Sequence, residues 1–153
     1  MPRTRVPILP SVEKVDTSYL EALLGYNARR GALAVIEVFM ERMAPYAMRP
    51  VDFSVASLIL HNPGITSRQL CAALGILPPN LVGIVNTLEK RGLIARMPHP
   101  SDGRAMGLHP TAEGIALMAE AEVTASTLEE EVGSRLTKAE RKTILRLLQK
   151  IYR

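Results

Sequence analysis

Apolar residues recur at every third or fourth position through most of the chain, which predicts a mostly helical protein. The longest such segment runs from Thr17 to about Tyr46. One of its faces follows Leu20, Leu23, Leu24, Asn27, Gly31, Val35, Val38 and Arg42, and a second follows Leu33, Ile36, Met40 and Met43. A helix that is apolar on two sides is buried on two sides. We therefore expect a single helix, about 45 Å long at roughly 1.5 Å per residue, that packs within the subunit on one face and against a partner on the other.

A pair of shorter helices is predicted further along the chain, after a short helix at Asp52–Leu60. Thr66 and Gln69 fit a capping box at the start of the first. Gly75 supplies a tight turn, and Pro78 and Pro79 fit the first turn of the second, where N–H groups have no partner. The second helix is expected to run to Arg91. Two helices joined by a glycine turn predict a helix-turn-helix, whose second helix enters the major groove of DNA.

A β-hairpin with a longer loop is predicted next, from the apolar runs Leu93–Arg96 and Ala105–His109 and the Pro, Ser, Asp and Gly between them. Arg104 lies in its tip, as in the cationic wing of a winged helix-turn-helix. Thr111 begins a helix through about Leu128, and Thr137 with Glu140 forms a capping box for a last helix.

The expected fold is α+β and mostly α: a winged helix-turn-helix with long N- and C-terminal helices. We expect a single domain over residues 1–153, divided into a winged helix-turn-helix lobe at 50–111, a helical lobe at 17–49 and 112–153, and a flexible arm at 1–16.

Charge is distributed unevenly, and this strengthens the case for a polyanionic partner. The net charge of the chain is +4. Residues 66–110 carry five Lys or Arg and two acids, whereas residues 111–153 carry seven of each sign. The middle of the chain is therefore its basic part.

Several classes of protein are disfavoured by the sequence. The one cysteine excludes an intramolecular disulfide and a cysteine-based metal site. No apolar run has the length of a membrane span or of a signal peptide, so we expect a cytoplasmic protein. No nucleophile–base pair, phosphate-binding loop or metal-ligand set stands out, and we expect neither enzymatic activity nor a cofactor.

Motifs at characteristic spacings cover nearly the whole chain: Asn62-Pro-Gly-Ile-Thr66, Leu70-Cys-Ala-Ala-Leu-Gly75, Leu88-Glu-Lys-Arg-Gly-Leu-Ile94, and Pro98-His-Pro-Ser-Asp-Gly-Arg104 followed by Thr111-Ala-Glu-Gly114. With them the chain resembles the MarR family of bacterial transcription regulators. The resemblance implies a homodimer held by the long N- and C-terminal helices, so that 17–49 and 112–153 form a dimerisation lobe. It also implies a recognition helix in the major groove and a wing arginine in the minor groove. Many members are released from DNA by a small aromatic or phenolic ligand.

The recognition helix departs from the family pattern. Ser or Thr and a later Arg are usual near its start, where this chain has Leu77-Pro-Pro-Asn80 and then Val82-Gly83, and the usual Asp-Arg pair is Asn86-Thr87. Base reading therefore cannot depend on a mid-helix arginine. Asn80, Asn86 and Thr87 are the polar groups left, and Asn pairs best with adenine.

The candidate DNA-binding residues are Arg68, Gln69, Pro79, Asn80, Gly83, Asn86, Thr87, Lys90, Arg96, Asp102 and Arg104. Arg104 is expected in a narrow minor groove, oriented by Asp102; the alternative is a surface arginine paired with Asp102. The other cations and Gln69 are candidate phosphate or groove-edge contacts, or plain solvated groups. Asn80 reads a base or bonds to the helix start.

An effector is expected in a cleft beside the long first helix, with candidate contacts Tyr26, Arg30, Met43, Tyr46, Phe53 and His61, of which an arginine would meet a carboxylate. The alternative is that most of these residues belong to the core. Cys71 is expected to be buried and inert. The sequence thus predicts a regulator, a repressor in the first instance, on a pseudo-palindromic operator; the alternative is a ligand or redox sensor that acts through protein contacts, with DNA binding weak or lost.

Overall fold

The computed structural model describes residues 12–153, so most of the predicted arm at 1–16 lies outside the described residues. The chain divides into two compact units, Met1–Leu33 and Ala34–Arg153. The first unit contains α1 (Ser18–Glu21) and the start of α2, whose bounds are Leu24–Arg42.

The prediction of one continuous helix from Thr17 to Tyr46 is wrong near both ends. It is interrupted between Glu21 and Leu24, where the side-chain amide of Asn27 donates to the carbonyl oxygens of Glu21 (2.7 Å) and Leu23 (2.8 Å). The first of these bonds satisfies the Glu21 carbonyl, which the interruption leaves without a helical partner, whereas the Leu23 carbonyl also accepts the backbone N–H of Asn27 at 3.2 Å. At the other end α2 stops at Arg42, before a 3-10 turn, η1, at Ala44–Tyr46.

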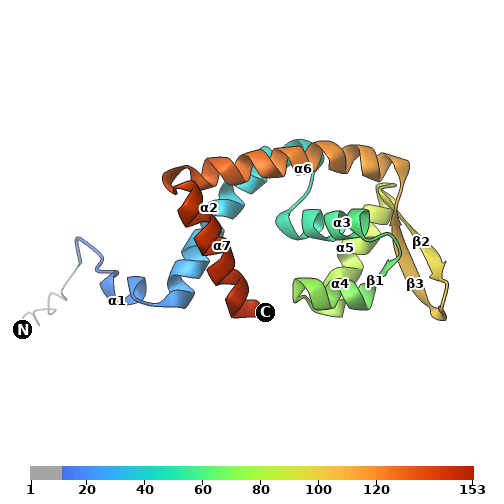
Figure 1. The fold of residues 1–153 in the computed structure, drawn as a ribbon, viewed down its shortest axis with the longest axis horizontal. Helices are drawn as coiled ribbons and strands as arrows, with labels where there is room; N and C mark the ends of the chain where they lie inside the picture. The colour runs from blue at the N-terminus through green and yellow to red at the C-terminus, as the bar shows by residue number, and fades with distance from the viewer. Residues whose placement is uncertain (1–11) are drawn as a thin grey trace, which may run out of the picture. The chain divides into compact units, whose positions relative to one another are not determined.

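The second unit is mostly helical with a small antiparallel sheet (Figure 1). After η1 its elements are α3 (Pro50–His61), β1 (Ile65–Thr66), α4 (Ser67–Leu74), α5 (Pro78–Lys90), β2 (Ile94–His99), β3 (Asp102–Pro110), α6 (Ala112–Val132), η2 (Gly133–Arg135) and α7 (Lys138–Tyr152). Helices α3, α4 and α5 contact one another, and α6 contacts α3 and the sheet. The predicted fold class, α+β and mostly α, is confirmed.

The helix-turn-helix forms as local chemistry predicts. The backbone N–H of Gln69 donates to Thr66 Oγ1 at 3.3 Å, and the N–H of Thr66 donates to Gln69 Oε1 at 3.0 Å, which completes the capping box. Gly75 ends α4 in the left-handed conformation with φ 63°, which favours glycine. Pro78 then opens α5.

The wing has longer strands and a shorter loop than predicted. The two strands pair until the register slips between Pro98 and His99, and only Pro100 and Ser101 separate them. Proline normally ends a strand, but the sheet order β1-β3-β2 puts β2 at an edge, where a missing N–H is tolerated. Strand β1, which pairs Ile65 with Leu108, was not predicted.

One aliphatic core joins the helix-turn-helix to the sheet and to α6; its fully buried members include Ile59, Leu70, Leu81, Leu88, Leu108 and Leu128.

Within residues 12–153 no single helix is long and apolar enough to span a membrane. Helices α4 and α5 together have the length and composition of a span, but the pair is bent by 116°.

The start of α6 lies against the base of the wing. Thr111 Oγ1 donates to the Gly92 carbonyl at 2.6 Å and accepts from the Gly114 N–H at 3.0 Å. A Cβ at Gly114 would lie 2.9 Å from the carbonyl carbon of Leu93 and closer still to its oxygen. Glycine is therefore required three residues after Thr111.

Candidate nucleic-acid interface and pocket

Helix α5 has one buried and one exposed face. Leu81, Ile84, Val85 and Leu88 are buried in the core. The other nine residues of the helix are exposed: Pro78, Pro79, Asn80, Val82, Gly83, Asn86, Thr87, Glu89 and Lys90. The exposed face thus contains every α5 residue that the sequence marked as a DNA contact.

Hydrogen bonds within α5 reduce what this face can offer a base. The hydroxyl of Thr87 donates to the Gly83 carbonyl at 2.9 Å. Among the described residues the Asn80 side chain has no hydrogen-bond partner, so the alternative that it bonds to the helix start is not realised. Of these two candidate base readers, Asn80 is the one with its full bonding capacity available.

Arg96 connects the wing to α5. From β2, its Nη2 donates to Asn86 Oδ1 at 2.6 Å and its Nε pairs with Glu89 Oε2 at 3.0 Å. The first bond engages the side-chain oxygen of Asn86, and the amide donors of Asn86 have no partner among the described residues. The ion pair with Glu89 partly neutralises a cation that was predicted to contact phosphate.

At the tip of the wing, Asp102 holds the turn through the backbone. Its Oδ1 accepts the N–H of Arg104 at 3.0 Å. The Arg104 guanidinium forms no ion pair with any residue that the structure describes, and the side chain is exposed. Asp102 therefore shapes the loop without neutralising the arginine.

Arg68 and Lys90 are exposed on α4 and α5, and within residues 12–153 neither is paired with an acid. The side-chain oxygen of Gln69 is engaged in the capping box of α4.

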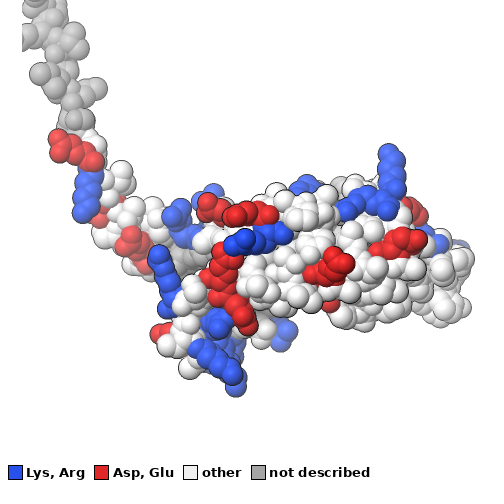
Figure 2. Space-filling view, turned by 90° about the horizontal axis from the view of Figure 1, so that it is seen from above, with Lys and Arg blue, Asp and Glu red and all other residues white. Residues whose placement is uncertain are grey.

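On the face seen in Figure 2, acidic and basic side chains are interspersed. This agrees with the equal numbers of both signs in residues 111–153.

Arg91 has a structural role that the sequence did not reveal. Its guanidinium donates to the carbonyl oxygens of Tyr46 (2.7 Å) and Ala47 (2.9 Å), and Ala47 has a left-handed backbone with φ 49°. The contact fastens the end of α5 to the segment before α3. From the sequence, Arg91 counted only as one of the five cations in residues 66–110.

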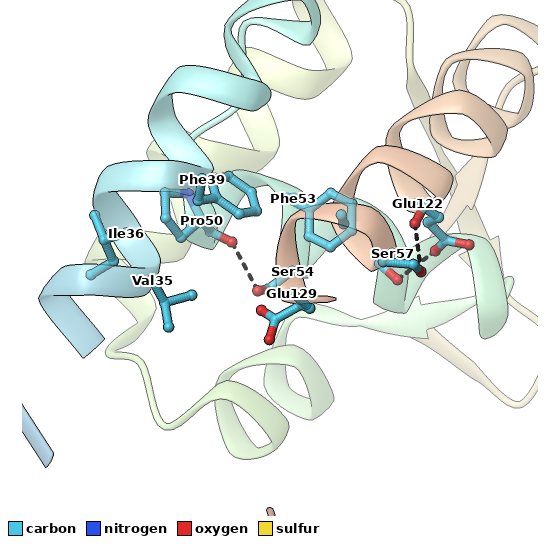
Figure 3. Close-up of a pocket in the computed structure, with 11 residues that line it drawn as sticks. Val35, Ile36, Phe39, Pro50, Phe53, Ser54, Ser57, Glu122 and Glu129 are labelled. Carbon is cyan, nitrogen blue, oxygen red and sulfur yellow. Dashed lines mark hydrogen bonds between the residues drawn. The ribbon is translucent and has the colours of Figure 1, made fainter. Parts of the chain in front are cut away.

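A pocket of about 480 Å³ opens between the end of α2, α3 and α6 (Figure 3). Its apolar side includes Val35, Ile36 and Pro50, with the rings of Phe39 and Phe53 in an edge-to-face arrangement at 5.7 Å. Its polar side includes Ser54, Ser57, Glu122, Ser126 and Glu129.

Of the six predicted effector contacts, only Phe53 lines this pocket. Met43 is 0% exposed and belongs to the core, and the Tyr46 hydroxyl bonds to that of Thr124 at 2.8 Å. Tyr26 and Arg30 belong to the other unit. His61 lies near the pocket through its 2.9 Å contact with Glu122.

The pocket is acidic. Glu122 accepts a hydrogen bond from the Ser57 hydroxyl at 2.7 Å, and Glu129 lines the same pocket (Figure 3). Like charges disfavour a second anion nearby. A neutral aromatic group with a donor hydroxyl matches these walls better than an aromatic carboxylate does.

The start of α3 is fixed by an ion pair. Arg49 Nε lies 2.9 Å from Asp52 Oδ2, and the carboxylate also accepts the Arg49 N–H at 3.0 Å. Burial raises the pKa of Asp52, but the hydrogen bonds and charge of Arg49 outweigh it, so the pKa lies below its ordinary value of 3.8. The charged carboxylate is therefore part of the helix cap.

Two other features carry less chemistry. Cys71 is half-buried against the core instead of fully buried as predicted, because it lies on the flank of α4 beside Leu70, which is fully buried. Among the described residues, no three His, Cys, Asp or Glu side chains are grouped as metal ligands would be.

Comparison with known proteins gives concordant results. A model of the MarR family matches residues 48–105. Over 131 residues the chain is 32% identical to the transcriptional regulatory protein assigned to the hcr operon of Thauera aromatica. The aligned region covers 85% of this chain and 79% of that protein.

Two solved structures of the transcriptional repressor CouR are also similar. One, bound to a 23-mer DNA duplex, is 36% identical with a TM-score of 0.86 and covers 92% of this chain and 100% of that chain. The other, bound to p-coumaroyl-CoA, is 34% identical with a TM-score of 0.81 and covers 92% and 99%.

Proposed function

The chain belongs to the MarR family and is a DNA-binding transcriptional regulator, and from that premise we propose that it is a homodimeric repressor released by an aromatic effector. The exposed face of α5 beside an unpaired wing arginine carries the proposal. Two copies of α5 would occupy major grooves about one DNA turn, or roughly 34 Å, apart on a pseudo-palindrome. A cytoplasmic location follows from this role.

The apolar stripe of α7 supports the dimer. Ile144, Leu147, Leu148 and Ile151 follow one another at helical spacing, and no residue of α7 is buried in the described chain. An exposed stripe of this kind is stabilised by covering it. We assign residues 17–49 and 112–153 to dimerisation, 50–111 to DNA binding and 1–16 to a flexible arm, within one domain.

On DNA, Arg104 enters the minor groove while Arg68 and Lys90 contact phosphates. Asn80 and the amide of Asn86 face base edges beside Pro79, Gly83 and Thr87, and Arg96, Gln69 and Asp102 position their neighbours. Arg104→Ala tests the scheme: the slope of log affinity against log salt is expected to flatten by about 0.9 for each phosphate that the variant no longer neutralises. Lys14→Ala, which removes an exposed cation outside the winged helix, is the matched control, and an unchanged slope for Arg104→Ala would contradict the wing contact.

The effector we propose is a hydroxylated aromatic ring joined to coenzyme A as a thioester. CouR, at 34% identity, binds p-coumaroyl-CoA, and pockets for such ligands measure about 300–1,000 Å³. A thioester is neutral where a free acid is anionic, which suits a pocket containing Glu122 and Glu129. The phenolic hydroxyl would donate to one of these carboxylates.

A thermal-shift assay distinguishes the candidates. p-Coumaroyl-CoA is expected to raise the apparent stability, by about 2.7 kcal/mol at a hundred times its Kd, and to release DNA. p-Coumarate, salicylate and coenzyme A alone are expected to do neither. Equal stabilisation by p-coumarate would refute the thioester. In Glu129→Gln, the difference in stabilisation between p-coumaroyl-CoA and the free acids is expected to become smaller.

A further inference from the structure

The recognition helix begins with large apolar side chains that the core does not use. Leu77, the N-cap residue of α5, is 69% exposed, and Val82 is 57% exposed. Val82 lies three residues after Pro79 and four before Asn86, so all three belong to the face opposite the core. Isolated exposed apolar residues are common, but Val82 lies on the exposed face of α5 and Leu77 lies at its N-terminal end, the part of a recognition helix that contacts base edges.

The same face has few hydrogen bonds left for bases. Arg96 donates to the side-chain oxygen of Asn86, and the Thr87 hydroxyl donates to the Gly83 carbonyl. Helix α5 contains no arginine that could pair with guanine. Gly83 has no side chain, and a Cβ there would meet nothing within 4 Å, so the helix backbone can approach the bases closely. In the major groove, the C5-methyl of thymine is the feature that apolar side chains contact.

We propose that Leu77 and Val82 recognise thymine C5-methyl groups in the major groove, and that these contacts, with Asn80 on adenine, set the preference of each half-site. The inference rests on the proposed function, since it requires α5 to enter the groove. Charge supports this occupant, because Lys90 at the other end of α5 and Arg68 on α4 are exposed cations with no acidic partner among the described residues. Operator half-sites are therefore rich in A·T pairs at the positions that α5 covers.

The test begins with selection of a duplex from a random library by the full-length protein. The selected duplex is then resynthesised with deoxyuridine in place of single thymidines. Uracil keeps the base pairing and the minor-groove edge and removes only the methyl group, so the contribution of Arg104 is unchanged. Loss of a recognised methyl group is expected to weaken binding about fourfold, the free energy of one buried methyl group.

Variants assign the contact to its residues. In Val82→Ala and Leu77→Ala, the ratio of affinities for thymine and uracil duplexes is expected to approach one at the position each residue covers. Val15→Ala is the matched control: Val15 is 75% exposed and lies outside the segments assigned to DNA binding and to dimerisation, and its loss is expected to leave the ratio unchanged. Leu77 and Val82 are both exposed, so their variants are expected to fold.

The outcomes separate the two hypotheses. If no duplex is enriched over random DNA, the proposed function is overturned. If a duplex is bound specifically but every uracil substitution is neutral, methyl recognition is overturned and the proposed function stands. A uracil effect that persists undiminished in both Val82→Ala and Leu77→Ala overturns the assignment to these residues.

Discussion

Gly114→Ala is expected to destabilise the fold by forcing α6 away from the base of the wing. The new Cβ would lie 2.9 Å from the carbonyl carbon and 3.3 Å from the Cα of Leu93, and closer still to the oxygen. All three are backbone atoms, so no change of side-chain rotamer relieves the overlap. Leu93 is itself buried, with its N–H bonded to the Leu88 carbonyl at 3.0 Å, and therefore the helix must move.

Two hydrogen bonds are broken when α6 moves: Thr111 N–H to Leu93 O (3.1 Å) and Thr111 Oγ1 to Gly92 O (2.6 Å). Each contributes about 1 kcal/mol, and overpacking costs about 1–3 kcal/mol more. The better helix propensity of alanine returns about 1 kcal/mol. The free energy of unfolding should fall by about 2–4 kcal/mol, a decrease in Tm of roughly 5–15 °C.

Urea unfolding at one fixed protein concentration measures this change, because the stability of a dimer depends on concentration. Gly83→Ala is the control: it is also a helical glycine, but its new Cβ meets nothing within 4 Å. Its stability is expected to rise by up to about 1 kcal/mol. If Gly114→Ala were as stable as the parent or as Gly83→Ala, the close packing of α6 on Leu93 would be refuted.

Two further predictions concern charge. Glu89→Gln releases Arg96 from its 3.0 Å ion pair, so operator affinity should rise and its salt slope steepen by about 0.9 for each additional phosphate neutralised; an unchanged slope would show that Arg96 stays off the DNA. Asp52→Asn should lower stability at neutral pH, because the pKa of Asp52 is depressed in the fold and its contribution is present above the ordinary value of 3.8. When urea unfolding is measured as a function of pH, the difference in free energy of unfolding between parent and variant should disappear as the pH falls below that value. A difference that stays constant with pH would contradict the role of the charge at the start of α3.

Elements fixed by neighbours in sequence were predicted correctly. The capping boxes at Thr66 and Thr137 and the turn at Gly75 each depend on residues within one helical turn. The break before Leu24 was missed because apolar spacing continues through it, and only the side-chain bonds of Asn27 explain it. The strands of the wing were predicted too short because strand pairing is non-local, and the register slip at Pro98 depends on the partner strand.

The sequence predicted which surfaces of the protein would face DNA, but not which side chains on them are paired with one another. The face of α5 and the tip of the wing follow from helical spacing and turn residues. Which cation is neutralised depends on how β2 approaches α5, and that approach places Arg96 on Glu89 and Asn86. The acidic side of the pocket was also missed, because Glu122 and Glu129 lie far along the sequence from Phe53.

These pairings change what the basic segment can do on DNA. Of the five cations in residues 66–110, Arg91 is bonded to two carbonyl oxygens and Arg96 is paired with Glu89. Three cations of this segment remain per subunit for phosphates, so the segment contributes about −5.4 to the salt slope of a dimer, or six neutralised phosphates at about −0.9 each. A modest electrostatic share leaves more of the specificity to uncharged contacts. The exposed apolar residues at the start of α5 are then a principal source of sequence discrimination rather than an accident of composition.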